Sequence, residues 1–291
     1  MKAIKKLAAL LLVLCMVTAL CACSDQGTGN NNDNNTPSEN VEASTAPSDE
    51  PGAESDEPAQ GGDTADGFTT INEGKLTVAT SPDFPPYEYL DDNGDVVGIE
   101  VDILKLIADK LGLELQIDPM DFDSALLAVQ QGKSDMVVSG VTILPERQLV
   151  MNFTDSYTNA VQVIVVPQGS DVTLDNLGEQ QIGVQRGTTG DIFTTDDYGE
   201  DHVTGYDSYT LVVQALLNGQ IDCIVMDDAV AREYVAANPG LTILDTAYAD
   251  EDYAFGIDKS NDALTRAVTD ALNDLIADGT VGDIIARYIN G

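Results

Sequence analysis

Two residues of opposite charge, Arg147 and Asp227, stand where short apolar runs end and helices are expected to begin. Arg147 follows Pro145, which suits the first turn of a helix because its φ is already set and no N–H is needed there. A guanidinium beside the unpaired N–H groups of a helix start suits a carboxylate. Asp227 ends the apolar run 221–226, where its carboxylate could bind an ammonium group. The local pattern alone fits a solvated arginine and a helix-capping aspartate at least as well.

A third stretch, 182–191, has the sequence IGVQRGTTGD, which is typical of a strand, a glycine turn and a helix start. Backbone N–H groups at Thr188, Thr189 and Gly190 would be free there to receive an anion. Glycine turns before helices are common and most bind no ligand, so this stretch is a weak signal by itself. It indicates a binding site only in combination with the stretches around Arg147 and Asp227.

Strands and helices alternate from Lys75 onward, which predicts an α/β protein with two open, mostly parallel sheets covered on both faces. The expected strands lie near 76–79, 113–117, 135–138, 161–166, 181–184, 222–226 and 241–244. The expected helices lie near 99–111, 124–131, 190–196, 209–217, 229–237, 262–277 and 281–288. Because the alternation restarts near Val161, two lobes are expected to face each other across a cleft.

Lobe 1 is expected to span 74–160 and 254–291, and lobe 2 to span 161–253. Two strands are expected to join the lobes, with the chain crossing along 162–166 and returning along 253–257. The hinge is expected near 157–161 and 249–253. Ligands in open α/β sheets collect at the carboxyl ends of strands, so the three candidate stretches are expected to face the cleft.

The first 73 residues differ from the rest in composition. Residues 1–23 combine three lysines with the apolar run 7–20 and small residues before a cysteine, which predicts an export signal. A transmembrane anchor is the alternative, and the shortness of the apolar run disfavours it. The segment 20–23 resembles a bacterial lipobox, so Cys23 is expected to carry a lipid that holds the protein at the membrane. Residues 24–73 contain twelve acidic residues and no Lys or Arg, which predicts a disordered acidic linker.

Composition excludes several function classes. The 291 residues carry a formal net charge of −37, which argues against nucleic acids and anionic membrane surfaces as partners. His202 is the single histidine, so histidine-based catalysis and metal sites built on paired histidines are nearly excluded. Only Cys223 lies outside the first 23 residues, so no internal disulfide is expected. We expect a monomer with no cofactor and no metal.

Several longer motifs fall in the order and spacing of one known family. They are TSPDFPPYEYL from Thr80, VGIEVDILKLIADKLG from Val97, MDFDSALLAVQQGKSDMVVSGVTILPERQ from Met120, FTDSY from Phe153 and the GTTG turn from Gly187. Over nearly all of 75–291 the chain resembles the polar amino-acid-binding proteins of ABC importers, which are bacterial extracellular solute-binding proteins of family 3. The resemblance implies a type II periplasmic-binding-protein-like fold, in which two lobes joined by two strands close over a ligand.

The resemblance also implies a set of ligand-binding residues. They are Ser81, Phe84, Phe122, Gly140, Thr142, Arg147, Gln185, Thr188, Thr189 and Asp227. Arg147 would pair with the ligand α-carboxylate, helped by the N–H and hydroxyl of Thr142 and by the N–H groups of the GTTG turn. Asp227 and the Gly140 carbonyl would receive the α-ammonium group. Two aromatic rings, Phe84 and Phe122, would enclose the ligand side chain.

Two departures from the family pattern bear on specificity. Ser81 replaces an aspartate that reads the far end of the substrate in glutamine and basic amino-acid binders, which argues against arginine or lysine and for a polar, uncharged side chain. Asp83 could substitute for that carboxylate if the proline-rich loop shifts, although an exposed turn residue is the simpler interpretation. Thr189 replaces a common glycine and is expected to narrow the carboxylate pocket.

The resemblance implies an extracytoplasmic lipoprotein, on the outer face of a Gram-positive cell membrane, that delivers a free L-amino acid to an ABC permease. One alternative is a cyclohexadienyl or arogenate dehydratase-like enzyme, which would need a general acid such as Asp83, Glu88 or Asp228. Another is the sensor domain of a receptor kinase or channel. Such a sensor needs a transmembrane helix after the binding domain, and the sequence ends at Gly291.

Overall fold

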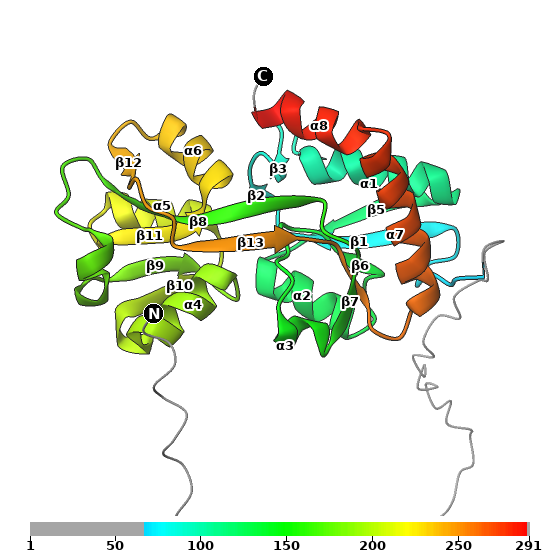
Figure 1. Cartoon of the computed structure of the whole chain (residues 1–291), viewed down its shortest axis with the longest axis horizontal. Coiled ribbons are helices and arrows are strands. Elements are labelled where there is room, and N and C mark those ends of the chain that lie inside the picture. The colour runs from blue at the N-terminus through cyan, green and yellow to red at the C-terminus, as the bar shows by residue number, and fades with distance from the viewer. Residues whose placement is uncertain (1–66, 290–291) are drawn as a thin grey trace, which may run out of the picture. The chain divides into compact units, whose positions relative to one another are not determined.

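The computed structural model describes residues 67–289, and Figure 1 traces them in colour. The predicted signal peptide, the lipidation site Cys23 and most of the predicted linker lie outside the described residues. Contacts divide the chain into the units Met1–Ser55 and Asp56–Gly291, and every described residue belongs to the second unit. Among the described residues, no helix is long and apolar enough to cross a membrane.

Lobe 1 is built on a five-stranded sheet with the order β5-β1-β6-β14-β7. Its strands are β1 (Lys75–Thr80), β5 (Glu114–Pro119), β6 (Met136–Val137), β7 (Met151–Phe153) and β14 (Gly256–Asp258). Strand β1 runs parallel to β5 and β6, whereas β14 runs antiparallel to β6 and β7. The three parallel strands follow from the βαβ connections that the sequence predicted.

Five helices accompany this sheet. They are α1 (Ile99–Leu111), α2 (Phe122–Gln130), α3 (Pro145–Gln148), α7 (Asp262–Ala277) and α8 (Thr280–Ile289). Helices α1, α7 and α8 pack against one another, and α2 packs against β1, β6 and β14 (Figure 1). Helix α1 buries Ile99, Ile103 and Ile107, whose spacing of four residues places them on one face. A small sheet of β2 (Asp83–Phe84), β3 (Glu88–Leu90) and β4 (Val96–Val97) carries the proline-rich loop.

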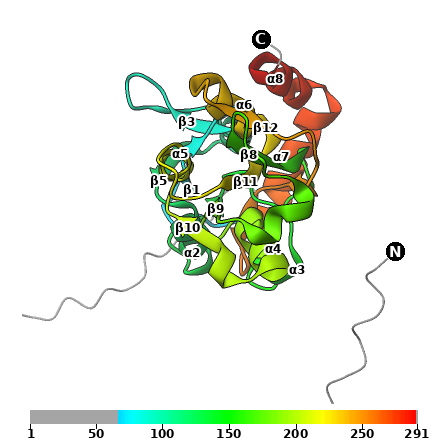
Figure 2. The same ribbon diagram turned by 90° about the vertical axis from the view of Figure 1, so that its left-hand side faces the viewer.

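Lobe 2 is built on a second sheet with the order β10-β9-β11-β8-β12, and β13 also pairs with β8. Its strands are β8 (Thr158–Pro167), β9 (Ile182–Gln185), β10 (Val203–Tyr206), β11 (Cys223–Asp227), β12 (Leu241–Ile243) and β13 (Ala249–Tyr253). Helices α4 (Thr189–Tyr198), α5 (Tyr209–Leu217) and α6 (Asp228–Ala237) pack around these strands (Figure 2). Two short 3-10 helices, Leu174–Glu179 and Glu200–His202, complete the lobe.

Both sheets are mixed, so the expectation of mostly parallel sheets needs refinement. Each lobe has a parallel core of three strands, but β14 in lobe 1 and β8 in lobe 2 run antiparallel to their neighbours. Strand β8 carries the chain into lobe 2, and β14 follows the return strand β13 within lobe 1. They do not belong to a βαβ unit, so no crossover helix forces them to be parallel.

Strands β8 and β13 cross between the lobes as an antiparallel pair (Figure 1). Their register runs from Thr158 opposite Tyr253 to Gln162 opposite Ala249, which coincides with the predicted hinge segments. The predicted return along 253–257 is wrong, because 256–258 form β14 within lobe 1. The return strand is β13, whose sequence ADEDY is polar, so the pattern of apolar runs did not predict it. Pairing with β8 satisfies its backbone hydrogen bonds.

The predicted linker extends too far into the folded unit. Phe68 is 1% exposed, and the Ile71 N–H donates to the buried carboxylate of Asp135 at 2.8 Å. The Thr69 carbonyl accepts a hydrogen bond from the Asn261 side chain at 2.8 Å. Residues 67–73 are therefore folded, and the assignment of these residues to a disordered linker is wrong. One aromatic residue in a long acidic stretch is too small a signal to change its average composition.

Candidate functional site

A narrow cavity of about 10 Å³ lies between the lobes. Its lining consists of Phe84, Phe122, Ser139, Gly140, Thr142, Arg147, Gln185, Thr188, Thr189 and Asp227. Nine of the ten predicted site residues therefore meet at one place, and Ser139 is the additional member. Ser81 is buried but does not line the cavity. The residues gather because strands of both lobes end at the cleft, as predicted for α/β sheets.

Arg147 is a buried cation on the lobe 1 side of the cavity. It lies in α3 behind Pro145 and is only 7% exposed. Its guanidinium donates to the Thr142 carbonyl and, across the cleft, to the Gly187 carbonyl, both at 3.0 Å. Among residues 67–289 it forms no ion pair with a carboxylate. Burial lowers the pKa of Arg147 to about 10, so it remains charged at neutral pH and favours an anion in the cavity.

Asp227 supplies the opposite charge from lobe 2. It occupies the position before α6, yet its side chain makes no capping hydrogen bond, so the capping interpretation is wrong for this residue. Its carboxylate accepts hydrogen bonds from the Gln162 amide, at 2.9 Å, and from the Tyr253 hydroxyl. Burial, followed by the charge of Glu251, raises the pKa of Asp227 well above its usual value. A cation beside this carboxylate would relieve the cost of burying its charge.

The glycine turn adds backbone N–H groups to the site. Gly187 adopts φ 77°, which glycine tolerates and which turns the chain from β9 into α4. Thr188 caps α4, because its hydroxyl oxygen accepts the Asp191 N–H at 3.3 Å. The Thr188 N–H points to the Gln185 carbonyl at 3.4 Å and is therefore engaged within the turn, contrary to expectation. Thr189 and Gly190 are the first two residues of α4, where no helical carbonyl precedes their N–H groups.

Thr142 differs from its expected role, and the difference reveals a residue that the sequence analysis missed. The Thr142 hydroxyl donates to Glu251 at 3.0 Å, so its proton is not directed at a ligand carboxylate. Glu251 lies on β13, is 5% exposed, and also approaches the Gln162 amide at 3.3 Å. It occupies the central inward position of ADEDY. Side chains alternate between the two faces of a strand, so recognising β13 as a strand would have placed Glu251 on the same inward face as Tyr253.

Two aromatic side chains form apolar walls of the cavity. Phe84 and Phe122 are each 5% exposed and line it from lobe 1, as predicted. The guanidinium carbon of Arg147 lies 5.6 Å from the centroid of the Phe122 ring. Gly140 adopts φ 53°, and a Cβ placed there would collide with the Phe84 ring. A glycine is therefore required at the point where the backbone passes the aromatic wall.

At another edge of the cavity, Gln185 connects the two lobes. Its amide nitrogen lies 3.2 Å from the Asp83 carboxylate and 3.4 Å from the Ser81 hydroxyl. Ser81 in turn donates to Asp83 at 3.1 Å. Asp83 is not the exposed turn residue that the sequence suggested, since its carboxylate also accepts the Tyr209 N–H. It does not line the cavity, so it does not replace the missing aspartate at Ser81.

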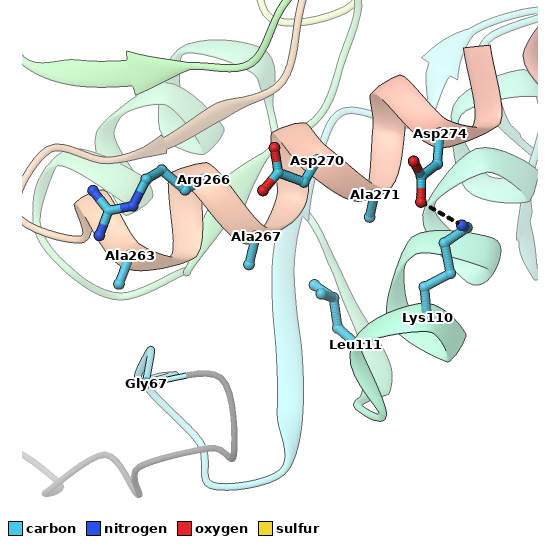
Figure 3. Close-up of a pocket in the computed structure, with 9 residues that line it drawn as sticks. All are labelled: Gly67, Lys110, Leu111, Ala263, Arg266, Ala267, Asp270, Ala271 and Asp274. Carbon is cyan, nitrogen blue, oxygen red and sulfur yellow. Dashed lines mark hydrogen bonds and ion pairs between the residues drawn. The ribbon is translucent and has the colours of Figure 1, made fainter. Parts of the chain in front are cut away.

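A second, larger depression lies on lobe 1, away from these residues. Figure 3 shows this groove, which has a volume of about 540 Å³ between the end of α1 and α7. Lys110 and Asp274 form an ion pair of 3.0 Å beside it, and three alanines of α7 line it. None of the predicted site residues contributes to it. Within residues 67–289, no cluster of His, Cys, Asp and Glu side chains is arranged to hold a metal ion.

Comparison with known proteins identifies the family. Residues 76–291 match the model of the bacterial extracellular solute-binding proteins, family 3. The chain belongs to this family. Over 227 residues it is 33% identical to a probable histidine-binding protein of Neisseria gonorrhoeae, covering 75% of this chain and 84% of that protein.

Two solved structures show how closely this family 3 protein follows its relatives. The arginine-, lysine-, histidine-binding protein ArtJ from Geobacillus stearothermophilus has 33% identity and a TM-score of 0.71, covering 75% of this chain and 96% of ArtJ. An ancestral arginine-binding protein bound to glutamine has 36% identity and a TM-score of 0.72, covering 76% and 100%. The predicted family and the predicted type II periplasmic-binding-protein fold are confirmed.

Proposed function

We propose that this family 3 solute-binding protein captures a free L-amino acid between its lobes and delivers it to an ABC-type importer in the membrane. One observation carries the proposal: Arg147 of lobe 1 and Asp227 of lobe 2 are both buried and both line the same small cavity. The names of the relatives, a probable histidine-binding protein and an arginine-, lysine-, histidine-binding protein, support the same class of ligand.

The two charges suit the backbone of an amino acid. A zwitterion leaves water at acceptable cost only when both of its charges find opposite partners. The α-carboxylate would pair with Arg147 and with the first N–H groups of α4, and the α-ammonium with Asp227 and the Gly140 carbonyl. Hydrogen bonds to charged groups contribute about 1.5–3 kcal/mol each, so several of them support micromolar binding at about −8 kcal/mol.

The side-chain end of the cavity favours a polar, uncharged ligand. Ser139 and Gln185 line the cavity, and Ser81 stands where the family pattern places an aspartate. No additional carboxylate besides Asp227 lines the cavity to neutralise a cationic side chain. The related ancestral arginine-binding protein bound to glutamine supports an amide side chain on this scaffold. We therefore propose a ligand of the glutamine type over arginine or lysine.

A thermal-shift screen tests the proposal. The twenty L-amino acids, with ornithine and cystine added, are mixed singly with the protein at millimolar concentration. A ligand that binds only the native state stabilises it by about 2.7 kcal/mol at a hundred times its Kd, so its melting temperature rises. We expect a rise with one or a few polar amino acids. An unchanged melting temperature with every compound would refute amino-acid capture.

We propose binding without chemistry. The three side chains suggested as general acids of a dehydratase, Asp83, Glu88 and Asp228, do not line the cavity. Asp228 instead pairs with Arg232 at 2.6 Å on the surface of α6. No feature of the described residues therefore favours the enzymatic alternative.

We also propose that the protein works as a monomer at the outer face of a Gram-positive cell membrane. The sequence supports export and a lipid on Cys23, and the acidic linker would give the binding lobes about 40 Å of reach from the membrane. Substituting Cys23→Ala tests the anchor. We expect the variant to appear in the culture medium, whereas the wild type sediments with membranes. Equal membrane association of both would contradict a lipid on Cys23.

A further inference from the structure

Three elements of lobe 2 converge on one residue of lobe 1, Asp83 in β2. The Tyr209 N–H, at the start of α5, donates to the carboxylate at 2.6 Å. The Gln185 amide at the end of β9 donates to the other carboxylate oxygen at 3.2 Å. The Tyr234 hydroxyl of α6 donates to the Asp83 main-chain carbonyl at 2.9 Å. Asp83 therefore accepts three hydrogen bonds from the opposite lobe.

The lobe 1 side of this contact is also held by groups of lobe 1 itself. The Ser81 hydroxyl donates to the carboxylate at 3.1 Å, and proline on either side of β2 restricts the backbone. The neighbouring Phe84 ring stacks on Tyr209 with centroids 5.9 Å apart and planes 29° apart. A carboxylate with few conformations loses little entropy when it forms a new contact.

The lobe 2 side offers a donor that needs a partner. Tyr209 is the first residue of α5, so its N–H has no carbonyl within the helix. The Ser208 side chain caps the Leu211 N–H and leaves the Tyr209 N–H for Asp83. A carboxylate at a helix start also interacts favourably with the helix dipole. When the lobes separate, these groups return to water.

We propose that Asp83 is an interlobe latch that stabilises the closed form without touching the ligand. The inference builds on the proposed function, because closure is what retains an amino acid, but the contacts themselves join protein to protein. Asp83 does not line the cavity, so it is a positioning residue for closure. Its loss leaves entry of the ligand unchanged and speeds its escape.

The first test follows the Tyr209 amide by hydrogen exchange, with and without an equimolar mixture of the twenty L-amino acids. The wild type is compared with Asp83→Ala and with Asp92→Ala, which removes an exposed carboxylate from the β3–β4 turn. We expect Asp83→Ala to accelerate Tyr209 exchange about tenfold or more in each condition in which the wild type protects it. Equal exchange in all three proteins, or no protection of Tyr209 in the wild type, overturns the latch.

The second test measures closure itself, because exchange at Tyr209 reports only one bond. Small-angle scattering follows the radius of gyration as the same mixture is titrated. We expect Asp83→Ala to need about tenfold more of the mixture to compact, and Tyr234→Phe to shift in the same direction by less. Coinciding titrations of Asp83→Ala and Asp92→Ala overturn the latch. If the wild type shows neither a smaller radius of gyration nor a higher melting temperature with the amino acids, the proposed function is refuted. Hydrogen exchange at Tyr209 without ligand then still tests the latch.

Discussion

At the scale of single residues, the protein keeps a cation and a carboxylate buried on opposite lobes without pairing them directly. Arg147 uses its N–H groups on two carbonyls, and Asp227 accepts from an amide and a phenol. These neutral partners satisfy the hydrogen-bonding groups of both side chains but leave each charge incompletely neutralised. A zwitterion bound between them would complete both charge balances.

Removing the cation is expected to abolish tight binding. Arg147→Ala leaves the ligand carboxylate buried without a charged partner, so we expect the affinity for the best ligand of the screen to fall by roughly 3 kcal/mol or more. Calorimetric titration measures the change. Arg186→Ala is the matched control, because Arg186 lies in the glycine turn that Arg147 contacts but is exposed and pairs with Asp207. Equal affinities for the two variants would contradict the role of Arg147.

A second buried pair, Glu88 and Glu100, predicts how stability depends on pH. Both side chains are 0% exposed, and the charge of one carboxyl group acts on the other. Burial raises the pKa of both above the ordinary value of 4.5, and the charge of Glu100 raises that of Glu88 further. Folding therefore takes up protons. The stability that this uptake contributes is fully present below pH 4.5 and is lost as the pH rises through the folded-state pKa values.

The variant Glu88→Gln tests whether this pair, and not the other carboxyl groups of the protein, governs the pH dependence of stability. The amide keeps an oxygen for the Ser139 hydroxyl and does not ionise, so it takes up no proton from solution. We expect the wild type to lose unfolding free energy as the pH rises above 4.5, and the variant to lose less. Denaturant titrations across this range measure both slopes. Parallel slopes would show that the pair does not govern the pH dependence.

At the scale of elements, the turn after β6 and the short helix α3 aim the lobe 1 side of the site. Gly140 lies in that turn, its N–H donates to Glu100 at 3.1 Å, and it passes directly under Phe84. Helix α3 then begins at Pro145 and presents Arg147. On the other lobe, the ends of β9 and β11 supply the turn and Asp227. Arg147 is thus positioned by a short helix, and Asp227 by the end of a strand.

Gly140→Ala is expected to damage both stability and binding. A Cβ there adds backbone strain at φ 53° and pushes against the Phe84 ring, which we expect to cost about 1–3 kcal/mol of unfolding free energy. Gly94→Ala is the control, because Gly94 also has a positive φ but nothing lies within 4 Å of its added Cβ. Denaturant unfolding compares them. A loss no larger than that of Gly94→Ala would remove crowding as the cause.

At the scale of the whole molecule, two mixed sheets are joined by the pair β8 and β13, and the described chain begins in lobe 1 before β1. Residues 67–73 are joined to that lobe by Phe68 and by the Asp135 carboxylate. The folded unit therefore includes a short segment that composition assigns to the linker.

Truncation tests where the folded unit starts. A chain beginning at residue 74 loses the buried Phe68 ring and the Ile71 hydrogen bond, so we expect it to be about 1.5–3 kcal/mol less stable than a chain beginning at residue 67. The chain from residue 67 should match the chain from residue 56. Chemical denaturation of the three proteins measures the differences, and equal stability of all three would contradict a structural role for 67–73.

The sequence by itself determined the family, the two-lobe α/β fold and nine residues that line one cavity. Local patterns predicted the fold: apolar runs indicated buried strands, and Pro145 and glycines indicated turns. Such signals are carried within a few residues, so a single chain displays them. The family and the nine residues followed from the resemblance of the longer motifs to family 3.

Only the tertiary structure decided which side chains meet across the cleft. Glu251 is an ordinary acidic residue in a polar stretch until β13 pairs with β8 and turns it inward. Asp83 looks like an exposed turn residue until α5, α6 and β9 approach it from the other lobe. Their partners lie more than a hundred residues away in several of these contacts, and only lobe packing brings such distant groups together.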